Sequence, residues 1–129
     1  MPIVRFIDAA IDDLRALNKK DPQILGQIFK KLVLLEISSD AGQPLAGPLS
    51  GYRKLTVGNR TWRIIWRLLK ESNGQMVIEI VEVWAIGARS DDEIYKEMKR
   101  RLSKAKPSPA TKSLQQVIEI LDRSRKKKE

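Results

Sequence analysis

Apolar residues in the first third of the chain are spaced as in one strand followed by two helices. Residues 3–7 form a short apolar run with β-branched members, which is typical of a strand. Apolar residues then recur at helical intervals over 9–17 and again over 24–35. Asp21 followed by Pro22 predicts an N-cap with proline at the first helical position. We therefore expect an antiparallel pair of helices after the first strand.

The middle of the chain alternates apolar runs with turn residues. A loop rich in Ser, Gly and Pro at 38–51 is followed by apolar runs at 54–57, 60–69 and 76–86. Gly58-Asn59 between the first two runs is a two-residue hairpin signal, and Asn73-Gly74 marks the second turn. Three strands joined by short turns predict an antiparallel meander.

Helical spacing returns in the last third of the chain. Ser90 and Glu93 fit a capping box at the start of a helix. The apolar stripe of this helix is Ile94, Met98 and Leu102. A second amphipathic stripe, farther along, is Leu114, Val117, Ile118 and Leu121. We expect one helix to complete the sheet domain and a shorter one to follow it.

Helices segregated from an antiparallel sheet predict an α+β fold. We divide the chain into a domain at 1–102, a linker of composition SKAKPSPA at 103–110, and a basic amphipathic helical tail at 111–129. The tail has two interpretations, which are compatible because its apolar and basic faces differ. Its apolar stripe can dock on the domain as an added helix, and its cations can bind ribosomal RNA nonspecifically.

The composition excludes several kinds of active site. The 129 residues include no Cys, so a disulfide framework, a thiolate nucleophile and a Cys-ligated zinc are excluded. His is also absent, which removes the usual general base near neutral pH and the commonest metal ligand. No apolar run approaches the roughly 20 residues of a membrane span, and the N-terminus lacks the order of a signal peptide. We expect a cytoplasmic protein without a membrane partner.

Positive charge is concentrated in two places. The formal net charge is +9, of which residues 99–129 supply most, with 11 basic and 3 acidic side chains. Residues 1–98 are nearly balanced, but the stretch 51–70 carries six cations and no acid. Such local excess suggests a polyanionic partner.

A two-residue turn at Gly58-Asn59 would place Lys54 directly opposite Arg63, on the same face of the hairpin as Thr56 and Arg67. Trp62 and Trp66 would lie on the other face, which we interpret as the core face. Like charges opposite each other are mildly destabilising, which favours an anion between them. A charged outer face on a half-exposed sheet is the alternative interpretation.

Several short motifs in this order resemble the RelE/ParE superfamily of bacterial toxins. They are G-Y-R-K-L at 51–55, V-G-N at 57–59, W-R-I-I-W at 62–66 and I-G-A-R-S-D-D-E-I-Y at 86–95. The similarity covers about residues 3–102 and is greatest to the RelE branch, whose members are ribosome-dependent messenger-RNA endonucleases. It implies the toxin of a toxin–antitoxin pair, which acts without metal or cofactor.

The resemblance also implies the active-site residues. The catalytic set carried over to this chain is Lys54, Arg63, Arg89 and Tyr95, and we expect Arg53, Arg60 and Arg67 to bind RNA beside it. The second lysine of the family falls on Thr56, a departure that removes one cation. A β-bulge would exchange Arg53 for Lys54, and this alternative stays open.

Metal-independent cleavage by a ribose 2′-hydroxyl needs a base and stabilisation of charge on the phosphate. Arginine stays protonated, so the base would be Lys54 or Tyr95, and a cluster of cations favours the deprotonated form of both. Arg63 and Arg89 would hold the phosphate. The isolated protein should be a poor nuclease, and the ribosome would supply the attack-ready RNA conformation.

Other interpretations of these residues remain. Arg89 can pair with Asp91 or Asp92, and Tyr95 can be a packing residue of its helix. Alternative functions are a ParE-like toxin that binds DNA gyrase and a basic RNA-binding module. The resemblance further implies a cognate antitoxin, a toxin–antitoxin hetero-oligomer, and the ribosome with its messenger RNA as partners.

Overall fold

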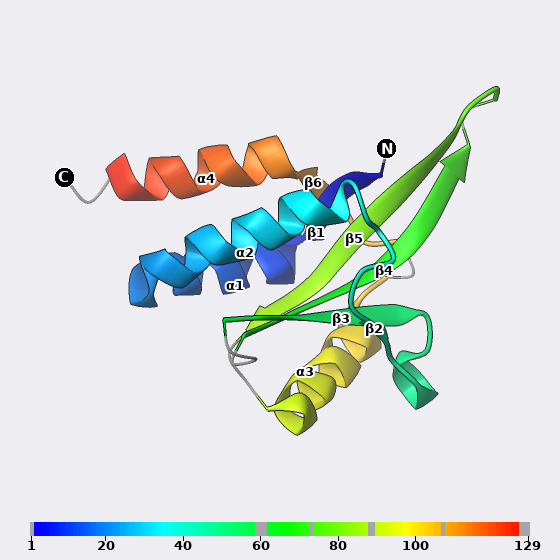
Figure 1. Ribbon diagram of the computed structural model, residues 1–129, viewed down its shortest axis with the longest axis horizontal. Coiled ribbons are helices and arrows are strands. Elements are labelled where there is room, and N and C mark those ends of the chain that lie inside the picture. The colour runs from blue at the N-terminus through cyan, green and yellow to red at the C-terminus, as the bar shows by residue number, and fades with distance from the viewer. Residues whose placement is uncertain (1, 59–61, 73, 88–89, 107, 127–129) are drawn as a thin grey trace.

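The structure is a computed structural model that describes residues 2–58, 62–72, 74–87, 90–106 and 108–126. Figure 1 shows its elements in chain order. They are β1 (Ile3–Ile7), α1 (Asp8–Lys20), α2 (Pro22–Leu35), β2 (Gln43–Pro44), the 3-10 helix η1 (Gly47–Leu49), β3 (Tyr52–Val57), β4 (Trp62–Ser72), β5 (Val77–Gly87), α3 (Asp91–Lys104), β6 (Thr111–Ser113) and α4 (Leu114–Lys126). The expected α+β fold is confirmed.

The strands form a six-stranded sheet in the order β2-β3-β4-β5-β1-β6. The meander of β3, β4 and β5 is antiparallel, as expected. β1 pairs with β5 in parallel, which requires a crossover, and the α1–α2 pair lies in the chain that returns to the sheet. The short strands β2 and β6 were not predicted, because three residues or fewer show no periodicity.

Both predicted helix caps are present. The side chain of Asp21 accepts a hydrogen bond from the backbone of Ile24 at 3.3 Å, and Pro22 begins α2. Ser90 accepts from the backbone of Glu93 at 3.3 Å and begins α3. These caps satisfy backbone donors that the first helical turn leaves free. They fix where α2 and α3 begin.

The predicted register of the β3–β4 hairpin is wrong by two residues. Val57 pairs with Trp62, so residues 58–61 connect the strands, and Lys54 lies opposite Ile65 rather than Arg63. Thr56 is the residue opposite Arg63. Because the shift is an even number, each side chain stays on its predicted face. Lys54 and Arg63 are therefore diagonal neighbours on one face.

Helices lie on both faces of the sheet (Figure 1), which is therefore less open than the half-exposed sheet that we considered, although β4 beyond Arg67 stays largely exposed. Figure 1 shows α1, α2 and α4 together on one side and α3 apart from them, near β3. On the core face Trp66 is completely buried and Trp62 packs partly against the core. On the opposite face Ile65 is also completely buried. The cations of this face therefore lie beside covered apolar residues.

The C-terminal segment packs against the domain. β6 pairs with β1 in antiparallel orientation, and Arg5 binds Thr111 through both its side-chain oxygen and its carbonyl, at 2.7 and 3.0 Å. Val117 and Leu121 of α4 are buried in the common core. This is the docked arrangement of the tail. Within the described part of the chain, no helix is long and apolar enough to cross a membrane.

Candidate active site

A pocket of about 460 Å³ opens where the start of α3 meets β3 and β4. It is lined by Gly42, Gln43, Lys54, Leu55, Thr56, Arg63 and Asp91. The lining thus joins the loop before β3, the two hairpin strands and the first turn of α3. Two of the four predicted catalytic residues, Lys54 and Arg63, lie in it.

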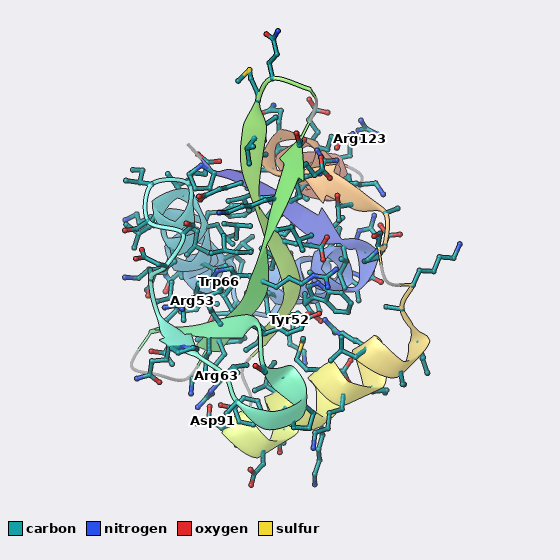
Figure 2. The ribbon with its side chains drawn as sticks, turned by 90° about the vertical axis from the view of Figure 1, so that its right-hand side faces the viewer. Tyr52, Arg53, Arg63, Trp66, Asp91 and Arg123 are labelled. Carbon is teal, nitrogen blue, oxygen red and sulfur yellow. The ribbon has the colours of Figure 1, made fainter. Side chains whose placement is uncertain are left out.

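Lys54 and Arg63 converge on one oxygen atom. Lys54 Nζ lies 3.1 Å and Arg63 Nε 2.7 Å from Oδ1 of Asp91, the first residue of α3. Figure 2 shows Arg63 and Asp91 facing each other beside this end of the helix. The hydrogen bond from Arg63, and after it the bond from Lys54, holds the pKa of the Asp91 carboxyl below its ordinary value. The pocket therefore binds an anion that the chain itself supplies.

The exposure of these three side chains is unequal. Lys54 is 12% exposed and Arg63 14%, whereas Asp91 is 47% exposed. The cations are thus held in place under the carboxylate, which faces solvent. Two positive groups share one negative group, so the cluster keeps a net positive charge.

Tyr95 lies one helical turn after Asp91 and completes the described part of the site. The Nζ atom of Lys54 lies 5.9 Å from the centre of the Tyr95 ring, within the range of a cation–π contact. The ring also packs partly against the core. Tyr95 is therefore both a packing residue and a neighbour of the cluster.

The position of α3 depends on an ion pair behind the site. Arg101 binds both carboxylate oxygens of Asp13 in α1 at 2.8 Å and donates to the carbonyl of Trp84 at 2.7 Å. Asp13 also accepts from the backbone of Ile86 at 2.9 Å. Bidentate arginine–carboxylate pairs fix orientation as well as distance. This pair fastens α3 to α1 and β5.

Glu97 strengthens the same end of α3. It pairs with Arg100 and, at 2.8 Å, with Arg101. Arg100 first and Arg101 after it lower the pKa of Glu97 to about 2, against the opposing effect of burial. Glu97 is therefore ionised throughout the ordinary pH range.

The wall of the pocket opposite α3 is held by backbone contacts. Arg53 donates to the carbonyls of Asp40, Ala41 and Gly42, at 2.6, 3.1 and 3.3 Å. Gly42 has φ of +77°, and a Cβ there would lie 2.2 Å from the carbonyl oxygen of Lys54. Arg53 thus stabilises the loop, and the observed pairing places Lys54, not Arg53, on the face of the site.

Arg67 does not line the pocket, and it pairs with a buried carboxylate. Its Nε lies 2.7 Å from Glu82 Oε1, and that carboxylate side chain is 5% exposed. The guanidinium lies 5.2 Å from the centre of the Trp84 ring and 5.8 Å from that of Tyr52. Trp84 also donates to Glu82, at 2.7 Å. Arg67 is thus held by contacts within the protein itself.

Two predicted residues, Arg60 and Arg89, lie outside the described residues. Thr56, which the resemblance in sequence aligns with a lysine of the RelE branch, lines the pocket. Asp91 is the member of the cluster that we did not predict. The sequence feature that could have indicated such a residue is the run of cations without acids from 51 to 70, because cations that lie close together need an anion from elsewhere in the chain. Among the described residues, no three acidic side chains gather to hold a metal ion.

Comparison with solved structures finds bacterial toxins. The chain matches the YoeB/ParE toxin from Agrobacterium tumefaciens at 18% identity and a TM-score of 0.55, over 70% of this chain and 100% of that chain. It matches a mutant of the E. coli toxin RelE in the free state at 22% identity and a TM-score of 0.57, over 79% of this chain and 99% of that chain. No protein-family model matches, nor does any curated protein. The chain has the fold of the RelE/ParE toxins.

Proposed function

We propose that this protein is the toxin of a toxin–antitoxin pair and acts as a metal-independent endoribonuclease that cleaves messenger RNA on the translating ribosome. The fold that it shares with RelE supports a toxin. The observation that carries the nuclease activity is the convergence of Lys54 and Arg63 on one acceptor oxygen in an open pocket. Donors so arranged suit a phosphate oxygen as well as a carboxylate.

The chemistry divides among the four predicted catalytic residues, of which Lys54 and Arg63 line the pocket. The 2′-oxygen of a ribose attacks the adjacent phosphorus as it loses its proton to a base, and the 5′-oxygen leaves with a proton, which gives a 2′,3′-cyclic phosphate. Lys54 and Tyr95 are the candidates for the base. Arg63 stabilises the negative charge that grows on the phosphate oxygens. Arg89 would add a second guanidinium.

The partners follow from this activity. A cytoplasmic toxin of this kind has a cognate antitoxin, with which it forms a hetero-oligomer, and it acts on messenger RNA held by the ribosome. No His or Cys is present to serve as a base, so free RNA should be cleaved poorly. A ribosome that fixes the RNA in an in-line conformation lowers the entropic part of the barrier.

The test is to induce the protein in growing cells and map new messenger-RNA ends within translated regions. Wild type should stop growth and produce such ends, and Arg63→Gln should produce neither. Lys30→Gln, which removes an exposed cation from α2, is the matched control and should behave as wild type. Intact transcripts in arrested cells, together with altered DNA supercoiling, would instead favour a gyrase-binding toxin.

The docked tail changes how the RNA-binding alternative is tested. Deleting 103–129 would uncover β1 and the core contacts of Val117 and Leu121, so loss of activity would not identify an RNA contact. Replacing the basic residues of 123–128 with Gln removes charge and leaves the buried stripe unchanged. Retained cleavage in this variant would place the activity in the pocket rather than in the tail.

A further inference from the structure

Asp91 occupies the position that a negatively charged ligand of Lys54 and Arg63 would take. One of its oxygens, Oδ1, accepts from both cations, at 3.1 and 2.7 Å. Within the described part of the chain, no group donates to the other oxygen. The carboxylate is therefore held through one atom, on the side of the pocket that is open to solvent.

A phosphodiester would satisfy the same two donors. It carries one negative charge, as the carboxylate does, and it presents two non-bridging oxygens. The observed distances are those of charge-assisted hydrogen bonds, which phosphate oxygens also form. The side chains of Lys54 and Arg63 are 12% and 14% exposed, and a phosphate oxygen that binds the same Nζ and Nε atoms has to replace Asp91 Oδ1. For these two donor atoms the two anions compete.

We propose that Asp91 is an internal anion at the phosphate site, which the RNA must displace, and that it thereby sets the affinity of the site. This inference rests on the proposed function for the identity of the ligand as RNA. It goes beyond that function because it assigns a role to an acidic residue in a site made otherwise of cations and a phenol.

The location of Asp91 allows this displacement. Its side chain is 47% exposed, so rotation about its own bonds carries the carboxylate into solvent without moving the backbone. The first turn of α3 favours negative charge through the helix dipole, whichever way the side chain points. The main cost of displacement is the loss of two hydrogen bonds, and the incoming phosphate replaces them.

The competition makes the site selective for RNA that is already held in place. A freely diffusing strand meets the full cost of displacing Asp91. A strand fixed by other contacts presents its phosphate at a high effective concentration, which overcomes the same cost. Asp91 therefore lowers the occupancy of the site by freely diffusing RNA more than the occupancy by RNA that is already held in place.

The test measures binding separately from cleavage. The probe is a short fluorescein-labelled single-stranded RNA with 2′-O-methyl riboses, which cannot undergo 2′ attack, and the readout is fluorescence anisotropy at one fixed salt concentration. Asp91→Asn should bind the probe roughly tenfold more tightly than wild type. Asp92→Asn is the matched control, since it removes the same charge one residue away, and should change affinity less than about threefold.

Asp91→Ala is a second variant that controls for new hydrogen bonds made by the asparagine side chain. It should bind the probe at least as tightly as Asp91→Asn. Cooperative melting within a few degrees of wild type would show that both variants fold. Weaker binding by both Asp91 variants, or a gain no larger than that of Asp92→Asn, would overturn the proposal. The binding assay and the cleavage assay test different proposals. Intact transcripts in cells would reject the nuclease activity. Cleavage by wild type without a gain in affinity in the Asp91 variants would reject only the role of Asp91.

Discussion

Arg63 and Arg67 lie four residues apart on the same face of β4, yet their carboxylate partners differ in exposure. Arg63 meets Asp91, which is 47% exposed, whereas Arg67 meets Glu82, which is 5% exposed. We call the group of Lys54, Arg63 and Asp91 the open cluster, and the group of Arg67, Glu82, Tyr52 and Trp84 the closed cluster. An open carboxylate can be exchanged for a ligand, and an enclosed one cannot.

The closed cluster has the features of a structural element. Glu82 accepts from both Arg67 and Trp84, and two aromatic rings lie beside the guanidinium. Burial raises the pKa of the Tyr52 hydroxyl, and the neighbouring Arg67 partly opposes this. A buried charge pair is costly to break from one side. The difference between the clusters therefore predicts that one governs stability and the other governs activity.

The largest effect is expected from breaking the closed cluster. Glu82→Ala removes a carboxylate that is 5% exposed and accepts from both Arg67 and the buried Trp84 N–H, which should lower the free energy of unfolding by about 3–5 kcal/mol. Urea unfolding followed by circular dichroism measures this change. Asp91→Ala in the open cluster is the comparison and should cost less than about 1 kcal/mol. Equal losses in the two variants would remove the distinction between the clusters.

The next effect should appear in activity alone. Lys54→Gln removes a cation and a candidate base from the open cluster, and we expect RNA cleavage on ribosomes to fall about 100-fold or more. The free energy of unfolding should change by less than about 1 kcal/mol, because Arg63 still pairs with the exposed Asp91. Lys30→Gln controls for the lost charge. A stable, fully active Lys54→Gln protein would contradict the assigned site.

A single methyl group at Gly42, beside Lys54 of the open cluster, should reduce both stability and cleavage. In Gly42→Ala the new Cβ meets the Lys54 carbonyl, at a φ that disfavours alanine, and we expect a loss of about 1–3 kcal/mol together with reduced cleavage. Thermal unfolding and the cleavage assay measure the two effects. Gly26→Ala in α2 has open space around its Cβ and should be neutral or stabilising.

The smallest effect concerns pH and the attachment of α3. The pKa of Glu97 is lowered in the folded state, so its stabilising contribution is complete above its ordinary pKa near 4.5 and is lost as the pH falls toward about 2. Glu97→Gln should therefore melt below wild type at pH 6, and the gap should narrow as the pH falls from 5 to 2.5.

Glu93→Gln, an exposed acid of the same helix, is the control for this pH dependence. A gap between wild type and Glu97→Gln that stays constant over the whole range would show that the carboxylate contributes no pH-dependent stability.

Local sequence signals predicted the features that depend on neighbouring residues. The caps at Asp21 and Ser90 need only a side chain and the backbone three residues later. The faces of β3 and β4 follow from strict alternation, which an even shift of register does not change. These parts of the fold could be predicted because no distant contact decides them.

The remaining features depend on contacts between distant segments. The hairpin pairs Val57 with Trp62, so its register differs by two residues from the one that the Gly-Asn pair predicted. Arg63 and Arg67 look equivalent in the sequence, and only the placement of Glu82 and Asp91 distinguishes them. Asp91 reaches Lys54 across 37 positions, which requires that α3 be docked by Arg101. Spacing within the chain carries no information about that docking.

The placement of β1 has a consequence for the order in which the protein folds. This first strand lies between β5 and β6, and its Arg5 binds a residue 106 positions later. Such distant pairing requires a long stretch of chain to lose conformational entropy before the stabilising contacts form, which slows folding relative to helical proteins of similar length. A growing chain therefore cannot complete its sheet until residues 111–113 have been synthesised, although every partner of Arg101 in the attachment of α3 precedes it in the chain.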